Sequence, residues 1–225
     1  MKIVIVAATD KEIALLRQRI DSSYLSDRLD INIEFKITGV GILASCFSIA
    51  ELIFTQKPDL IIQAGIAGTF DSRVASGTVF AVKNEFNGDM GVNESGIFND
   101  MFDLQLIQPN DFPFNARKLE NININKRNLT NLQIVDAITV NEVTTSPDRI
   151  LQLQEKYHPA LESMEGASLH YCCIKTGTEF IQIRSVSNIV GERDKSKWAM
   201  KDALENLSKT VLDYLESLTH LPQTL

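Results

Sequence analysis

The stretch ESMEGASLHYCC (162–173), followed after a short polar break by EFIQIRSVSN (179–188), decides the predicted fold. The first part predicts a helix, because small or apolar residues recur at helical spacing and Gly177 lies just beyond its end. The second part predicts a strand, because bulky apolar residues from Phe180 onward surround a narrow polar stripe.

Four polar side chains stand out in this stretch. Glu165 lies at the start of the predicted helix, and Arg184, Ser187 and Asn188 lie at the end of the predicted strand. Ligands of open α/β sheets bind at the carboxyl ends of strands and the adjoining helix termini. The four side chains therefore predict a site for a small polar molecule held by directed hydrogen bonds. From spacing alone, a Glu165–Arg184 ion pair with nothing bound explains the pattern equally well.

The rest of the chain alternates predicted strands and helices. Strands are expected over 3–8, 31–38, 60–64, 78–86, 133–140 and 180–187, and helices over 10–20, 42–54 and 196–218. The segment GIAGTF (65–70) is expected to be a loop. This alternation predicts an α/β fold in one domain over 1–225, built as a three-layer α/β/α sandwich.

One segment departs from this alternation. Residues 87–131 are rich in Asn, Asp, Gly and Pro and contain phenylalanines at 98, 102, 112 and 114. Loops this long in compact domains usually serve a site or a contact. We expect an insertion that lies over the site or at an oligomer contact.

The composition excludes several classes of protein. Hydrophobic residues make up 44% of the 225 residues, so a large core is expected and disorder is not. A net charge of −7 without a basic cluster disfavours nucleic-acid binding. The N-terminal apolar run 3–9 is too short for a signal peptide or a membrane span, which predicts a cytoplasmic protein. Cys46, Cys172 and Cys173 lack metal-site spacing, and we expect neither a metal nor a cofactor.

Two glycine motifs have more than one interpretation. Gly39-x-Gly41-x-x-Ala44 matches a dinucleotide fingerprint, but Asp59 precedes its strand instead of ending one, so a tight strand-to-helix turn is preferred. Gly65-Ile-Ala-Gly68 either lets a flat ligand approach the backbone or forms a simple turn.

Three further residues are of types that can act in catalysis. Glu12 lies in the first turn of the first helix, where it is either a solvated acid favoured by the helix dipole or a general base for water. His158 and His170 have no partner pattern, and His170 on an apolar helix face is expected in the core.

An ordered set of motifs resembles a known family. MKIVIVAATDKE with Glu12, GVGILAS, AGIAG, ESMEGA and IRSVSN are similar, in order and spacing, to the purine nucleosidase branch of the nucleoside phosphorylase superfamily. The resemblance covers nearly the whole chain. Within that branch, the helix SMEGASLHYCC and the segment FNDMFDLQLIQPNDFPF (98–114) resemble the futalosine hydrolases of the alternative menaquinone pathway.

The resemblance implies a mixed, twisted central sheet, a homo-oligomer that is most often a dimer, and hydrolysis of a purine nucleoside at its N-glycosidic bond. Glu12 would activate the attacking water, and Arg184 would pair with Glu165 and help to place that water. Glu165 would hold the ribose hydroxyls. The other substrate-binding positions would be Met164, Ala67, Gly68, Val143, Thr144, Ser187 and Trp198.

Asn188 predicts which base leaves. Adenosine-cleaving members of the branch have an aspartate at the matching position, whereas an amide can donate to O6 of a 6-oxopurine and accept from a protonated N7. The sequence therefore predicts hypoxanthine as the leaving base. The alternatives are a 5′-methylthioadenosine/S-adenosylhomocysteine nucleosidase, a phosphorylase, which Glu12 disfavours by repelling phosphate, and a catalytically silent nucleoside-binding protein.

Overall fold

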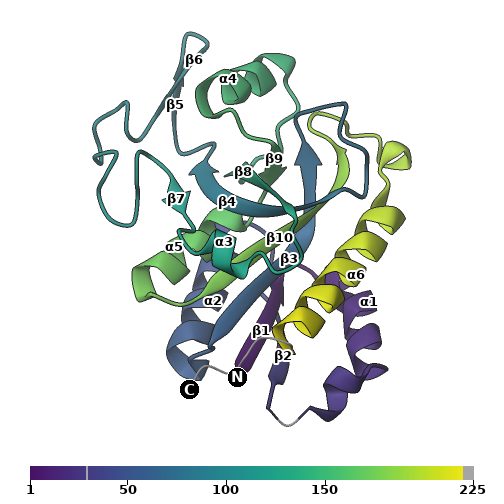
Figure 1. The fold of residues 1–225 in the computed structure, drawn as a ribbon. Helices are drawn as coiled ribbons and strands as arrows, with labels where there is room; N and C mark the ends of the chain where they lie inside the picture. The colour runs from purple at the N-terminus through teal and green to yellow at the C-terminus, as the bar shows by residue number, and fades with distance from the viewer. Residues whose placement is uncertain (29, 220–225) are drawn as a thin grey trace.

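The N-terminal strand β1 (Lys2–Ala7) lies inside a mixed sheet, where it pairs in parallel with β2 (Asn32–Ile37) and β3 (Leu60–Thr69) (Figure 1). The computed structural model describes residues 1–28 and 30–219. All but the first residue of β1 are buried, as expected for a near-continuous apolar run between two helical layers.

The remaining strands give the sheet its mixed character. β10 (Phe180–Ile189) runs parallel to β3, and β4 (Val79–Asn87) runs antiparallel to β10. β8 (Gln133–Thr139) then pairs in parallel with β4 and with the short β9 (Leu161–Ser163). β9 also pairs antiparallel with the end of β3, so the sheet closes on itself here instead of staying open.

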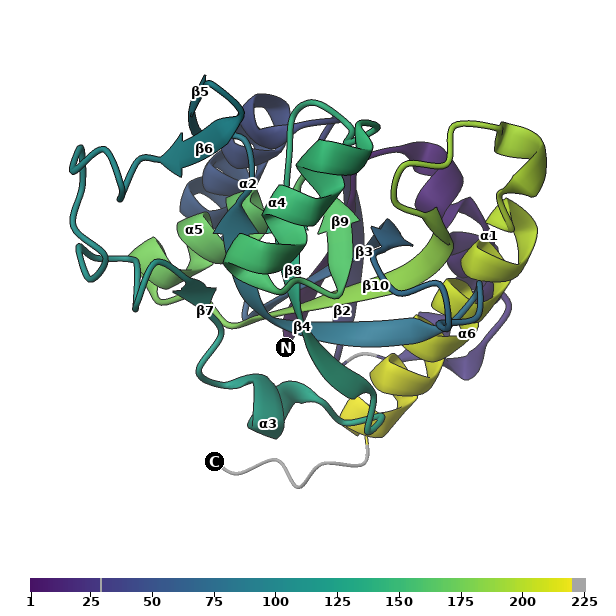
Figure 2. The ribbon, with the colours of Figure 1, turned by 90° about the horizontal axis from the view of Figure 1, so that it is seen from above.

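Helices cover both faces of the sheet, which confirms the predicted three-layer sandwich (Figures 1 and 2). α1 (Asp10–Asp21) and α6 (Met200–Thr219) pack on one face, and α2 (Ile42–Gln56) and α5 (Gly166–Thr176) pack on the other. Alternate side chains of β1 enter the two cores, because successive strand residues point to opposite faces. Those facing α1 and α6 are Ile3, Ile5 and Ala7, and those facing α2 and α5 are Val4 and Val6.

Several predicted boundaries are wrong, each for a tertiary reason. GIAGTF is not a loop, because β10 pairs with β3 as far as Thr69 and holds the segment extended. The helix expected from Glu162 begins only at Gly166, because Leu161–Ser163 pairs with two strands. The last helix begins at Met200, after a short 3₁₀ helix η2 (Lys195–Lys197).

Two helical elements outside the insertion 87–131 were not predicted. α4 (Pro147–Tyr157) begins after Ser146 with proline at its first position, a favoured helix start. The 3₁₀ helix η1 (Tyr24–Asp27) follows α1, and the Ser23 hydroxyl accepts from the Leu25 N–H at its start.

The insertion 87–131 contains short structured pieces instead of one long loop. β5 (Gly91–Glu94) and β6 (Ile97–Asp100) form an antiparallel hairpin beside α4 (Figure 1). β7 (Leu119–Glu120) pairs with β4, and α3 (Ile124–Arg127) is a single turn.

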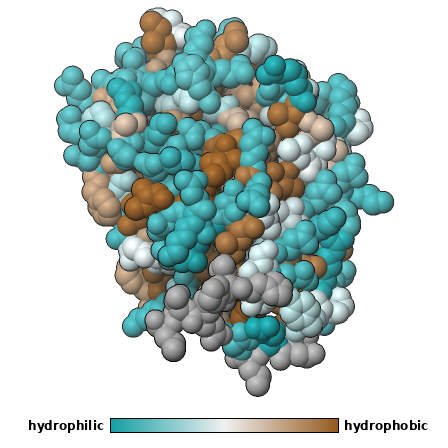
Figure 3. Space-filling view, viewed as in Figure 1, coloured by the Kyte–Doolittle hydropathy of each residue, from teal (hydrophilic) through white to brown (hydrophobic). Residues whose placement is uncertain are grey.

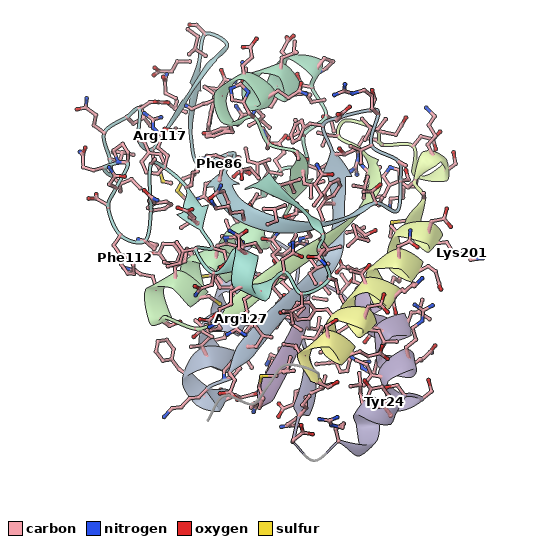
Figure 4. The ribbon with its side chains drawn as sticks, viewed as in Figure 1. Tyr24, Phe86, Phe112, Arg117, Arg127 and Lys201 are labelled. Carbon is pink, nitrogen blue, oxygen red and sulfur yellow. The ribbon has the colours of Figure 1, made fainter. Side chains whose placement is uncertain are left out.

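Aromatic and charged contacts hold the loops of the insertion to the body. The Tyr157 hydroxyl of α4 donates to Asp100 at 2.9 Å, and Arg117 pairs with Asp103 at 2.7 Å. Phe102 and Phe114 meet edge to face with ring centroids 5.2 Å apart. Figure 4 shows Arg117 and Phe112 on these loops, on the side of the molecule away from α6.

The surface is mixed in character. On the face that Figure 3 shows, hydrophobic residues form separate patches among hydrophilic ones. Within 1–28 and 30–219, every helix is too short or too polar to cross a lipid bilayer.

Candidate active site

A cavity of about 320 Å³ opens where β1, β3 and β10 end, and helix α5 begins at its wall. Ala8 and Thr9 directly follow β1, and the lining from β3 and β10 lies within their last residues. This is the edge where the sheet rule places ligands. The predicted residues that line it are Glu12, Ala67, Gly68, Val143, Met164, Glu165, Ser187, Asn188 and Trp198.

Two predicted residues lie outside this lining. Arg184 is 2% exposed and lies in the middle of β10, so its predicted position at the strand end is wrong. Thr144 is also buried and lines a neighbouring cavity of about 500 Å³. Val143 lines both cavities, so it marks the boundary between them. No described residue of 87–131 lines the first cavity.

Glu12 is fixed by three donors. One carboxylate oxygen accepts from the Thr9 N–H at 2.9 Å and from the Thr9 hydroxyl at 3.0 Å, and the other accepts from the Ile66 N–H at 3.2 Å. The residue is only 9% exposed, so the interpretation as a solvated surface acid is wrong. Donors on both oxygens hold the carboxylate in one orientation at the cavity wall.

Glu165 precedes the first turn of α5 and contacts Arg184. One of its oxygens accepts from the Gly41 N–H at 3.1 Å, and the other lies 3.8 Å from the Arg184 guanidinium. Burial raises the pKa of Glu165, and the positive charge of Arg184 acts in the opposite direction. The guanidinium also donates to the Gln63 side chain at 3.0 Å. The predicted pairing is present, with Arg184 behind the cavity wall.

Gly65 explains how these charges come together. A Cβ at this position would lie closer than 3 Å to both the Arg184 guanidinium and the Glu12 carboxylate. A side chain here would therefore push one of them away. Gly65, the first glycine of AGIAG, therefore permits the close approach of two side chains within β3 and does not form a turn.

Asn188 follows a bulge in β10. The register with β3 shifts between Val186 and Asn188, which leaves Ser187 as the extra residue. The Ser187 hydroxyl donates to the side-chain oxygen of Asn188 at 2.7 Å, and the side-chain N–H group of Asn188 donates to the Ile189 backbone carbonyl at 2.9 Å. One N–H and one lone pair of the amide therefore remain for a ligand.

Trp198 lies at the mouth of the cavity on the segment before α6. Its indole N–H donates to the Glu192 carbonyl at 3.0 Å, and the Ala199 N–H donates to the Ser187 carbonyl at 2.9 Å. These bonds tie the segment to the end of β10.

Glu162 is a lining residue that sequence reasoning missed. It lies two residues before Met164 on β9, is 7% exposed, and accepts from the Thr144 N–H at 3.1 Å. In the sequence, Glu162 stands between Leu161 and Ser163 at the start of the predicted helix, and nothing in that pattern indicates the strand β9.

A sealed polar cluster lies behind the cavity and beneath α5. The Glu85 carboxylate accepts from Gln182 at 2.8 Å and from the Thr139 hydroxyl at 2.9 Å, and Thr139 accepts from the Ala167 N–H at 2.8 Å. Complete burial raises the pKa of Glu85 to about 7. The histidine expected in the core, His170, is indeed fully buried.

His170 of α5 lies beside Gln182 of this cluster. Its Nδ1–H donates to the Leu119 carbonyl at 2.9 Å, since a carbonyl can only accept. Burial lowers the pKa of His170 to about 4, so the imidazole is neutral near pH 7. Across the described ranges, no group of three or more His, Cys, Asp or Glu side chains is placed to hold a metal ion.

Two relatives align with much of this chain. A futalosine hydrolase of Thermus thermophilus is 25% identical over 184 residues, which cover 77% of this chain and 77% of that protein. A 5′-methylthioadenosine/S-adenosylhomocysteine nucleosidase of Tolumonas auensis is 26% identical over 234 residues, covering 97% and 100%.

Solved structures share the fold. A mutant of the Helicobacter pylori 5′-methylthioadenosine nucleosidase, with 5′-methylthioadenosine in its active site, matches with a TM-score of 0.78 and 16% identity over 96% of this chain and 98% of that one. The native futalosine hydrolase of Helicobacter pylori matches with a TM-score of 0.76 and 17% identity, over 97% of each chain. A family model of the Phosphorylase superfamily matches residues 2–216. Because that model covers most of the chain, this chain belongs to the Phosphorylase superfamily.

Proposed function

We propose that this protein hydrolyses the N-glycosidic bond of futalosine, releasing hypoxanthine and dehypoxanthine futalosine in the alternative menaquinone pathway. The coarser statement, that the chain is a nucleosidase, rests on its family and on relatives named for this activity. The choice of futalosine rests on one observation, the Asn188 amide at the cavity wall.

The amide suits a 6-oxopurine. Its free N–H can donate to O6, and its free lone pair can accept from a protonated N7. Adenine presents a donor at its 6-amino group, so an amide oriented to donate would leave polar groups unpaired. Each such unmade bond costs roughly 1–3 kcal/mol.

In the proposed reaction, Glu12 is the general base for water. Its carboxylate takes a proton as the water oxygen bonds to C1′ of the ribose and the bond from C1′ to N9 breaks. The base leaves with the bonding electron pair and takes up a proton from solvent at N7, and the new N7–H donates a hydrogen bond to the side-chain oxygen of Asn188. Glu12 later returns its proton to solvent. The three donors that orient Glu12 hold it for this step.

The sugar becomes cationic in the transition state. In this proposal Glu165, which lines the cavity, accepts from the ribose hydroxyls and stabilises that charge. Arg184 is then a positioning residue, because it holds Glu165 from behind the wall. The remaining proposed contacts to base and sugar come from Met164, Ala67, Gly68, Val143, Ser187 and Trp198, with Thr144 supporting Val143 from the neighbouring cavity.

A second candidate is a 5′-methylthioadenosine/S-adenosylhomocysteine nucleosidase. The observation that favours it is the Tolumonas auensis relative, which aligns with 97% of this chain at 26% identity. The two candidates share the water chemistry and differ in the base that leaves.

The deciding experiment measures free base released from futalosine, inosine, methylthioadenosine and aminodeoxyfutalosine, with and without phosphate. Fast phosphate-independent release of hypoxanthine from futalosine is the expected result. Adenine release from methylthioadenosine alone would support the second candidate, and dependence on phosphate would indicate a phosphorylase. A thermal shift with hypoxanthine but no turnover would indicate a binding protein.

The variant Asn188→Asp tests the argument about the base. We expect it to lose activity on futalosine and to gain activity on aminodeoxyfutalosine, which differs at the 6-position. Unchanged preference in a folded Asn188→Asp protein would show that another residue selects the base.

We also propose a homo-oligomer, most simply a dimer, that uses the outer face of α2. Leu43, Phe47 and Phe54 lie on one side of this helix and are 87%, 71% and 71% exposed. Val40, which precedes α2, is 55% exposed and lines the cavity. A second copy on this face would cover apolar surface next to the site. Light scattering of the wild type and of Phe47→Asp tests this, with a monomer expected for the variant.

A further inference from the structure

Three neighbouring strands place Gly68 between two polar side chains. Gly68 on β3 pairs with Asn188 on β10 at one side and with Glu162 on β9 at the other. Residues opposite each other in paired strands project from the same face of the sheet. Asn188 does lie on that face, because a Cβ on Gly68 would be 3.4 Å from its amide nitrogen.

This arrangement makes a slot with a glycine floor. Adjacent strands are about 4.8 Å apart, so the backbones carrying Asn188 and Glu162 are separated by about 10 Å. Gly68 has no side chain to fill the space between them, and the side chain nearest to this space is that of Val190, whose Cγ2 lies 3.1 Å from where a Gly68 Cβ would be. All three residues line the same cavity, so a flat base can lie over Gly68 with a polar group at each side.

The Glu162 carboxylate is incompletely bonded. One oxygen accepts from the Thr144 N–H, but the other is buried and has no hydrogen-bond partner among the described residues. The positive charge of Arg149 acts on Glu162 and opposes the effect of burial on the pKa of Glu162. A carboxylate that is 93% buried (7% exposed) with a free oxygen is costly unless something donates to it.

We propose that Glu162 recognises the base, its free oxygen accepting a hydrogen bond from N1–H of a 6-oxopurine that lies over Gly68 opposite Asn188. This inference rests on the proposed function and extends it by naming a second residue that selects the base. In this arrangement Asn188 forms hydrogen bonds with O6 and N7, and Glu162 forms one with N1, which is bonded to the same carbon as O6.

N1 is where the two classes of purine differ most simply. In hypoxanthine N1 carries a hydrogen and donates, whereas in adenine N1 carries a lone pair and accepts. An ionised carboxylate pairs with the first and opposes the second. Burial raises the pKa of Glu162, so an N1–H donor also relieves the cost of keeping it ionised.

Glu162→Gln is the sharpest variant, because it keeps the size of the side chain. Its single oxygen must serve the Thr144 N–H, which turns the amide N–H group toward N1. That donor opposes hypoxanthine and suits adenine. Glu155→Gln, an identical change at an exposed position of α4, is the matched control.

The experiment measures the dissociation constants of free hypoxanthine and free adenine by calorimetry for wild type and both variants. We expect the wild type and Glu155→Gln to prefer hypoxanthine. In Glu162→Gln that preference should shrink by roughly 10- to 100-fold, the range for a hydrogen bond to a charged group. A folded Glu162→Gln protein with unchanged preference overturns the inference, as does a wild type that binds neither base.

A wild-type measurement keeps the inference testable if Glu162→Gln does not fold. 1-Methylhypoxanthine retains O6 and N7 but has no proton on N1, so it should bind at least tenfold more weakly than hypoxanthine. Equal binding overturns the inference.

Failure of the proposed function looks different. Turnover of futalosine with unchanged base preference in Glu162→Gln leaves the function standing and removes this role. A shifted base preference in Glu162→Gln, without turnover of any 6-oxopurine nucleoside by the wild type, supports the role of Glu162 and contradicts the proposed function.

Discussion

The cavity and the sealed cluster behind it both hold buried carboxylates, yet the two regions use them differently. In the cavity, backbone N–H groups hold Glu12, Glu162 and Glu165. In the cluster, Glu85 is held by the side chains of Gln182 and Thr139 and has no exposed surface.

The difference shows how one fold can keep carboxylates that act on a ligand apart from a carboxylate that links its strands and a helix. Backbone donors are fixed by the strands and remain in place when a ligand arrives, so the cavity carboxylates are oriented in advance. The cluster instead connects β4, β8 and α5, because Thr139 also accepts from the Ala167 N–H at the start of the helix. We therefore expect substitutions in the cavity to affect turnover, and substitutions in the cluster to affect stability.

The largest expected effect is on catalysis, from Glu12→Gln. The amide keeps the size of the side chain but cannot take a proton from water. We expect kcat for hypoxanthine release to fall about 1,000-fold, or about 4 kcal/mol. Thermal unfolding should remain close to that of the wild type and of the surface control Glu155→Gln. Activity within tenfold of the wild type would remove Glu12 as the base.

The second effect is a pH dependence of stability that belongs to the cluster. Glu85 has a pKa of about 7 in the folded protein against 4.5 ordinarily, so the folded state holds more protons between these values. Its contribution to stability is present below pH 4.5 and is lost as pH rises through 7, by about 3 kcal/mol.

His170 acts in the opposite sense. Its pKa is about 4 in the folded protein against 6.5 ordinarily, so its contribution is present above pH 6.5 and is lost as pH falls through 4, again by about 3 kcal/mol. Over the window from pH 4.5 to 6.5 the two slopes oppose each other.

Single variants should expose each slope. Urea unfolding between pH 4.5 and 6.5 should show stability rising with pH in Glu85→Gln and falling with pH in His170→Asn, against a flatter wild-type profile. Matching slopes in all three proteins would contradict the assignment to this cluster. Activity measured at fixed pH on the folded variants should change far less than in Glu12→Gln.

A smaller effect is expected from Glu165→Gln. The amide can still accept from the Gly41 N–H but carries no charge to stabilise a cationic sugar. We expect kcat/KM for futalosine to fall roughly 10- to 100-fold. A loss of stability with unchanged kcat/KM would instead place Glu165 among the supporting groups.

The smallest effect should come from Trp198→Phe, which keeps a ring at the cavity mouth and removes the indole bond to the Glu192 carbonyl. One neutral hydrogen bond contributes about 1 kcal/mol, so KM should rise about fivefold with kcat unchanged. A change in kcat would mean that Trp198 also helps to position the reacting groups.

The fold was predictable wherever periodicity is strong. The apolar run of β1 and the stripe of α6 predicted the layers that the structure has. The three-residue strand β9 was not, because so short a strand exists only through its pairing with β3 and β8. α4 was missed although its Ser146-Pro147 start was visible.

The sequence predicted which residues form the site better than it predicted how deeply each side chain is buried. The positions of Glu12, Glu165 and Asn188 at predicted helix starts and a strand end, together with the resemblance, predicted them as site residues, and the structure brings them to one cavity. Strand periodicity does not say how far a side chain lies from the mouth, so Arg184 was expected at the surface of the site and lies behind it. Glu162 was missed because its partner across the sheet, Gly68, is distant in sequence.

The closure of the sheet through β9 also bears on how this protein avoids self-association through its strands. A sheet that closes at one end has fewer unpaired strands to offer to other molecules, and in the part of the chain that the structure describes β2 is the remaining end of the main sheet path. Lys2 pairs with Glu34 at 3.1 Å, and Lys36 pairs with Glu51 at 3.3 Å. Charged side chains on an edge strand discourage edge-to-edge aggregation. The charged side chains of β2 therefore protect this end of the sheet.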